Sequence, residues 1–156
     1  MSLNLLKSIL HNIGVMAVGF GFAFLGRRLD LCFGMTEFSS PVITAAALLL
    51  LAAGFLLRVW ATFHFYERRM KVISLVPQRT LITSGPYGFS RNPLYLGGNV
   101  FIFSGAVLLL GSPMGLFLVA VNIVLVELMV RREEKQLERE FGEEWIRYRD
   151  RVRRWL

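Results

Sequence analysis

The chain has 156 residues, of which 54% are hydrophobic and 19% charged, and its mean hydropathy is +0.52. This composition is too apolar for a soluble domain of this size, so it indicates a membrane protein. The net charge of +7 does not indicate nucleic-acid binding, because the basic residues flank apolar stretches instead of alternating with aromatic residues along a stripe. Cys32 is the only cysteine, which excludes an intramolecular disulfide, and no residue spacing resembles a metal site.

Four apolar stretches approach the ~20 residues that a helix needs to cross a bilayer. They are residues 8–26, 41–65, 93–111 and 113–130. Arg58 and Glu127 lie inside the second and fourth stretches, so each charge should face the bundle or snorkel toward the interface. Only Gly111-Ser112-Pro113 separates the last two stretches, which predicts a tight antiparallel hairpin. We therefore expect an all-α, polytopic membrane protein with one domain, residues 1–156, and about four transmembrane helices.

The distribution of Lys and Arg predicts the orientation of these helices. The connection 67–92 contains five basic residues and the tail contains more, whereas the loop 27–40 has two arginines offset by Asp30 and Glu37. Cytoplasmic segments are the ones enriched in Lys and Arg. We expect the connection 67–92 and both termini to be cytoplasmic.

The tail has the pattern of an amphipathic helix. Apolar residues recur at steps of three and four, at Leu137, Phe141, Trp145, Tyr148, Val152 and Trp155. This spacing predicts an interfacial C-terminal helix over residues 131–156, with an interruption at Gly142. A helix that packs on a second subunit is the alternative, and the sequence does not specify the oligomeric state.

The segment 81–98 approaches the third stretch through turn residues, among them Gly85-Pro86 and Asn92-Pro93. Pro93 suits the first turn of a helix, where unpaired backbone N–H groups attract anions. Arg91 would lie just before this turn and Tyr95 within it. Gly97 and Gly98 permit the close approach of either a ligand or another helix, and the sequence favours neither reading.

Two adjacent carboxylates, Glu133 and Glu134, follow the fourth stretch. The short hairpin should bring them back beside Arg91 and Tyr95, which predicts a shared site. Adjacent residues on a helix point about 100° apart, so one carboxylate can face a pocket while the other pairs with Arg or Lys.

These motifs closely resemble the isoprenylcysteine carboxyl methyltransferase and phosphatidylethanolamine methyltransferase superfamily of integral membrane enzymes. That family combines a Gly-Pro-Tyr-type turn, an Arg-His-Pro-x-Tyr-x-Gly segment, a helical hairpin that ends in Glu-Glu, and a Phe-Gly-Glu-Glu-Tyr-type stretch. The corresponding residues here are Gly85-Pro86-Tyr87, Arg91 to Gly97, Glu133-Glu134 and Phe141 to Trp145. The resemblance covers about the C-terminal half of the chain.

The resemblance implies an S-adenosylmethionine site, with S-adenosylhomocysteine as product, and a lipid-like or prenylated methyl acceptor. The implied cofactor contacts are Arg79, Thr80, Leu81, Ile82, Tyr87, Arg91, Asn92, Pro93, Leu94, Tyr95 and Glu133 or Glu134. Two positions depart from the family pattern. Asn92 replaces a histidine, which argues against an acid/base role there. Met129 stands where the family has a substrate-binding arginine, and Arg131 and Arg132 are the nearest substitutes.

The cofactor carries a sulfonium, an ammonium and a carboxylate. An acidic residue of the pair could bind the ammonium or ribose hydroxyls, Tyr87 and Tyr95 could line the adenine or sulfonium, and Arg79 or Arg91 could hold the carboxylate. Direct methyl transfer depends on alignment and exclusion of water.

Two residues are catalytic candidates, Glu127 in the fourth stretch and Arg131 directly after it. Arg131 could position a carboxylate acceptor, and Glu127 could deprotonate an amine acceptor. Alternatively, Glu127 could form a structural pair with Arg131 or with Arg58.

Two other classes of function remain open from the sequence. One is a sterol-reductase-like membrane oxidoreductase that uses NADPH, although no Gly-x-Gly-x-x-Gly fingerprint follows a strand. The other is a non-catalytic membrane protein on the same scaffold.

Overall fold

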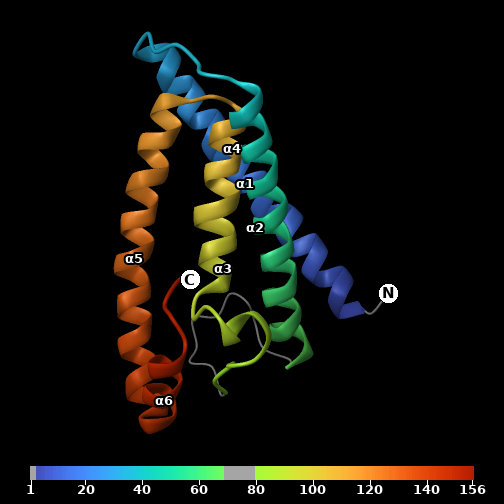
Figure 1. The fold of residues 1–156 in the computed structure, drawn as a ribbon, viewed down its shortest axis with the longest axis vertical. Helices are drawn as coiled ribbons and strands as arrows, with labels where there is room; N and C mark the ends of the chain where they lie inside the picture. Colours follow the sequence, from blue (N-terminus) through green and yellow to red (C-terminus); the bar gives the residue numbers. More distant parts are fainter. Residues whose placement is uncertain (1–2, 69–79) are drawn as a thin grey trace.

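The computed structural model describes residues 3–68 and 80–156, which form an antiparallel helical bundle (Figure 1). The first two passes are α1 (Leu3–Cys32) and α2 (Pro41–Glu67). The third pass joins α3 (Pro93–Tyr95), the π-helix η2 (Leu96–Ile102) and α4 (Phe103–Leu109), and the fourth is α5 (Pro113–Phe141). A short 3₁₀ helix, η1 (Gly85–Gly88), precedes α3, and α6 (Glu143–Arg151) follows α5. Apart from one isolated bridge between Ser90 and Arg153, the described residues form no β-structure.

The membrane-spanning character of the bundle comes from three of its helices. The helices α1, α2 and α5 are long and apolar enough to cross a bilayer, whereas the apolar third pass, Pro93–Leu109, is shorter. Over the described residues, the structure therefore confirms the all-α class and contains three long apolar helices. A membrane crossing by the third pass, the single-domain boundaries and the cytoplasmic location of the termini remain predictions.

The hairpin between the third and fourth passes is tight, as the sequence predicts. The Oγ atom of Ser112 caps α5 by accepting a hydrogen bond from the Gly115 amide at 2.8 Å. At the end of α1, buried Asp30 accepts a hydrogen bond from the Met114 amide at 2.8 Å. These bonds fix α5 against α1 and so set the direction in which α5 returns.

Small residues let the second and third passes approach closely. A Cβ atom added at Gly54 would lie 2.5 Å from the carbonyl oxygen of Gly97, and one added at Gly98 would lie 2.7 Å from Nη1 of Arg58. Of the two readings of Gly97 and Gly98, the structure therefore favours helix packing. The π-helix begins at this contact, and such irregular turns are frequent at functional sites.

The tail differs from the single helix predicted over residues 131–156. The helix α5 continues without interruption to Phe141, because residues 131–141 are good helix formers and contain no breaker. The predicted interruption at Gly142 is confirmed, since this glycine has φ 50° and separates α5 from α6. Residues 152–156 are not helical. The predicted apolar face is thus divided among three segments, of which α6 buries Trp145 and Tyr148.

We expect Gly26→Ala to lower the thermal unfolding midpoint in detergent. A Cβ atom at this position would lie 2.6 Å from Cα of Gly115, so α1 and α5 must separate, at a cost of about 1–3 kcal/mol. Gly14→Ala is the matched control, because no atom lies within 4 Å of its added Cβ and alanine favours the helix. Equal midpoints for the two variants would contradict this packing.

Candidate functional site

The centre of the candidate site is an ionic cluster around Glu134, which we call the Glu134 clasp (Glu134, Arg91 and Arg154). Nη2 of Arg91 lies 2.9 Å from Oε1 of Glu134, and Nη2 of Arg154 lies 2.7 Å from Oε2. The Arg91 and Glu134 side chains are only 9% and 10% exposed. The pKa of Arg154 is raised, and its hydrogen bonds to Glu134 are the main cause. The clasp joins the segment before α3, helix α5 and the tail.

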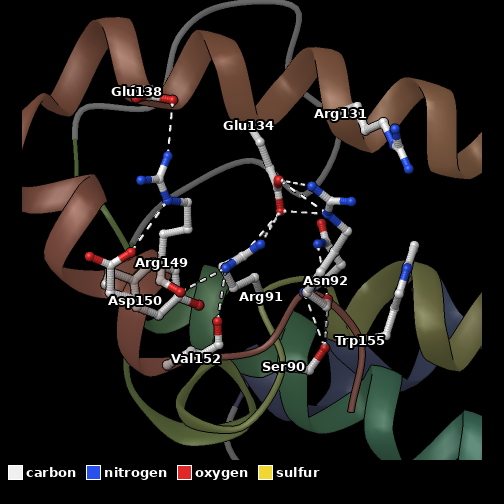
Figure 2. A network of polar contacts seen from close by, with 12 residues as sticks. Ser90, Arg91, Asn92, Arg131, Glu134, Glu138, Arg149, Asp150, Val152 and Trp155 are labelled. Carbon is white, nitrogen blue, oxygen red and sulfur yellow. Dashed lines mark hydrogen bonds and ion pairs between the residues drawn. The ribbon is translucent and has the colours of Figure 1, made fainter.

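Arg91 also holds the tail through its other donors, as Figure 2 shows. Its Nη1 atom donates to the carbonyl oxygens of Arg149 and Val152 at 2.8 and 2.9 Å. Its guanidinium lies over the Trp145 ring, 5.8 Å from the centroid. All three guanidinium nitrogens thus have partners in the protein. Arg91 therefore does not fit the predicted role of holding a cofactor carboxylate.

Asn92 is likewise occupied with the tail. Its side-chain amide donates to the carbonyl oxygen of Arg154 at 3.2 Å, and its backbone amide donates to Oγ of buried Ser90 at 3.2 Å. The Arg91 amide donates to the carbonyl oxygen of Arg153 at 2.9 Å. The segment before α3 and the tail therefore pair along their backbones.

Glu127 is the second carboxylate that the tail contacts. It accepts hydrogen bonds from Nε of Arg131 at 2.6 Å, Nη1 of Arg154 at 2.8 Å and the Trp155 indole at 3.0 Å. Three donors stabilise the ionised carboxylate and so oppose a role as a general base. The alternative structural pair with Arg131 is confirmed. The alternative pair with Arg58 is wrong, because Arg58 faces α1 and the third pass.

Glu133, in contrast, lies on the exposed side of the acid pair. Its Oε1 atom accepts a hydrogen bond from the Tyr95 hydroxyl at 2.8 Å. The predicted meeting of Arg91 and Tyr95 with the two glutamates is therefore confirmed as geometry. The predicted pairing of one glutamate is also confirmed, since Glu134 pairs with Arg91 and Arg154, whereas a pocket beside Glu133 stays a prediction. Cofactor contact by any of these residues stays a prediction.

Tyr87 packs between α2 and α6. Its ring lies 5.8 Å from that of Phe65, and its carbonyl oxygen accepts a hydrogen bond from the Tyr148 hydroxyl at 2.8 Å. The Tyr87 side chain is 7% exposed, and its hydroxyl has no hydrogen-bond partner within the parts of the chain that the structure describes. An unpaired buried hydroxyl is costly, so it marks a position where a ligand could bond.

The remaining predicted contacts have mixed surroundings. Ile82 and Leu94 pack in one apolar cluster with Tyr87 and Ala61, and Pro93 is fully buried. Leu81 is half-buried and Thr80 is exposed. Arg79 lies outside the described residues.

Arg58 faces the interior of the bundle, which is one of the two positions that the sequence predicts for it, the other being a side chain that snorkels toward the interface. It is 8% exposed, donates from Nε to Oδ1 of Asn12 at 2.8 Å, and donates from Nη1 to the Leu94 carbonyl oxygen at 2.6 Å. Asn12 in turn donates to Oγ1 of Thr62 at 2.8 Å. A buried polar network thus connects α1, α2 and the start of α3.

An apolar cavity of about 270 Å³ lies at the opposite end of the bundle, beside Met35, Pro113, Met114 and Phe117. None of the predicted site residues lines it. In the described ranges, no three His, Cys, Asp or Glu residues are grouped so that they could hold a metal.

Comparison with known protein families identifies the family of this chain. A model of the phospholipid methyltransferase family matches residues 42–144. The chain belongs to this phospholipid methyltransferase family. Searches of curated proteins and of solved structures found no match. The membership indicates a membrane methyltransferase and gives no support to the reductase or the non-catalytic alternative.

The part matched to the phospholipid methyltransferase family includes Arg58, the segment before α3 and both glutamates, but ends before Arg154. Sequence reasoning missed Arg154 and Trp155 as partners of the acid-bearing helix. The only signal was the Arg153-Arg154-Trp155 run, in which neighbouring arginines look equivalent.

We expect Glu134→Gln to destabilise this methyltransferase-family protein by about 3–5 kcal/mol, because two arginines lose a buried counter-charge. Glu138→Gln is the control, since Glu138 and its partner Arg149 are 44% and 38% exposed and the pair should contribute less than about 1 kcal/mol. Thermal unfolding in detergent measures both changes. Similar midpoints for the two variants would show that the clasp contributes little to stability.

Proposed function

We propose that this protein is an S-adenosylmethionine-dependent methyltransferase that transfers a methyl group directly to a lipid-like acceptor. The observation that carries the proposal is the contact between Tyr95 and exposed Glu133 at the start of the third pass. It supplies a carboxylate and an aromatic ring at the site that the family membership leads us to expect. We also propose that this end of the bundle faces the cytoplasm, where the basic residues gather.

The charged residues at this site that do not pair with each other complement the charges of the cofactor. Glu133 would bind the ammonium or ribose hydroxyls, because Tyr95 is its only hydrogen-bond partner among the described residues. Glu134 and Arg91 satisfy each other and do not fit as ligands. Tyr87 and Tyr95 supply aromatic surface, and Thr80, Leu81 and Arg79 remain proposed contacts.

When bound, the cofactor supplies an electrophilic methyl group, so no covalent enzyme intermediate is needed. The residues of the chain bind, orient and exclude water. The Glu134 clasp holds α5 at a fixed position relative to the segment before α3, which fixes Glu133 relative to Tyr95. Glu127 is held by three donors, so we do not assign it as the base.

The acceptor reaches this site from the membrane in our proposal. The outer faces of the bundle expose many large apolar side chains, as expected for contact with lipid. Arg131 is the candidate contact for an anionic group on the acceptor, because its side chain is 60% exposed near the site. The proposal covers two kinds of acceptor, a prenylated carboxylate and a phospholipid amine.

Calorimetric titration of the detergent-purified protein with S-adenosylhomocysteine and, separately, with NADPH tests the cofactor. We expect binding of S-adenosylhomocysteine alone. Binding of NADPH alone would favour a reductase, and binding of neither would favour a non-catalytic protein. Label transfer from methyl-labelled cofactor to extracted membrane lipids then tests the acceptor class.

We expect Glu133→Gln to weaken S-adenosylhomocysteine binding by about tenfold or more, because a charge-assisted hydrogen bond is lost. The thermal midpoint without ligand should stay near that of the wild type, since Glu133 is exposed. Glu138→Gln is again the control and should bind normally. Unchanged affinity in Glu133→Gln would remove Glu133 from the binding site.

A further inference from the structure

Arg58 is a buried cation without a carboxylate partner in the described residues. Its hydrogen bonds go to neutral acceptors, Oδ1 of Asn12 and the Leu94 carbonyl oxygen. Its Nη2 atom has no hydrogen-bond partner in the ranges 3–68 and 80–156. The remaining residues, 1–2 and 69–79, contain no Asp or Glu in their sequence. Among residues 3–68 and 80–156 Arg58 forms no ion pair, although burying an unbalanced charge is costly.

The Tyr87 side chain packs against α2 about one helical turn from this cation, and its hydroxyl has no hydrogen-bond partner among the described residues. Arg58 precedes Ala61 by about one helical turn, and Ala61 packs in the same cluster as Tyr87 and Leu94. Leu94 connects the two groups, because its carbonyl oxygen accepts the hydrogen bond from Arg58. Burial, and to a lesser extent Tyr148, raises the pKa of Tyr87, whereas the positive charge of Arg58 opposes this rise. The two groups are thus within electrostatic reach.

The acidic side of the site lies next to this pair along the chain. Tyr95 follows Leu94 directly and donates its hydroxyl hydrogen bond to Glu133. The start of the third pass therefore contacts the unbalanced cation through the Leu94 carbonyl oxygen and the exposed carboxylate through the Tyr95 hydroxyl. A zwitterion with a carboxylate and an ammonium complements this arrangement.

We propose that Arg58 and the Tyr87 hydroxyl bind the carboxylate of the amino-acid end of the cofactor, while Glu133 binds its ammonium. This inference rests on the proposed function and replaces Arg91 in the role first assigned to it. It also accounts for an arginine inside an apolar helix and for a buried hydroxyl without a partner. The phosphate of a lipid is another anion that could meet Arg58, and the experiment separates the two.

The experiment compares two ligands that differ only in this carboxylate. One is S-adenosylhomocysteine, and the other is its decarboxylated analogue, which keeps the amine. The wild type should bind the first at least about tenfold more tightly, as expected for a lost charge-assisted bond. In Tyr87→Phe and in Arg58→Met this preference should fall to about threefold or less. Arg58→Lys keeps the charge and should retain part of the preference.

The Tyr87→Phe variant separates an effect on ligand binding from an effect on folding. Its hydroxyl has no hydrogen-bond partner in the described residues, so its removal should leave the ligand-free thermal midpoint unchanged or higher. Tyr66→Phe, the same chemical change near the end of α2, is the control and should keep the full preference. Loss of the preference in Tyr66→Phe would show that the effect is not specific to the proposed subsite.

Three outcomes are distinguishable. If the wild type binds neither ligand, the proposed function fails, and this inference fails with it. If the wild type and Tyr87→Phe both bind and show the same preference, only this inference is overturned. The inference is also overturned if removal of the cofactor carboxylate has no effect on binding. In that case, Arg58 binds a lipid anion instead if anionic phospholipid, but not neutral phospholipid, raises the thermal unfolding midpoint of the wild type more than that of Arg58→Lys.

Discussion

Glu134 is a buried carboxylate shared by two arginines from distant parts of the chain, and this sharing determines how one end of the bundle is built. Burying the charges of Glu134 and Arg91 is costly, and short, well-directed hydrogen bonds compensate for that cost. Arg91 arrives from the segment before α3 and Arg154 from the tail, so both segments must lie against α5 at one level. The backbone pairing of Arg91 with Arg153 follows from the same arrangement.

The Glu134 clasp leaves the adjacent residues Glu133 and Glu134 with different roles. Glu134 and Arg91 neutralise each other and hold the architecture, which leaves Glu133 exposed beside Tyr95. The arginines divide in a similar way. Arg91 and Arg154 have carboxylate partners, whereas Arg58 has only neutral ones among the described residues. A carboxylate and a cation without an ion-pair partner among the described residues thus both contact the start of the third pass. This division of charge is what we connect with a zwitterionic cofactor.

Much of this arrangement could be predicted from the sequence. Apolar length indicated the long helices, Gly111 and Pro113 indicated the hairpin, and the hairpin required the glutamates to return to Arg91 and Tyr95. The limits have physical causes. The apolar residues of the tail recur every three or four positions on both sides of Gly142. This spacing therefore could not show that residues 131–141 extend α5 whereas the following residues turn back. Arg154 was missed because its role depends on a non-helical tail, for which no periodicity exists.

Hydrogen–deuterium exchange of the wild type, with and without S-adenosylhomocysteine, tests most directly whether this end of the bundle holds the cofactor. The account predicts slower exchange over residues 84–98 and around Glu133 when the ligand is present. The loop 33–40, at the other end of the bundle (Figure 1), should be unchanged. Protection confined to the loop, or absent from residues 84–98 at saturating ligand, would contradict the account.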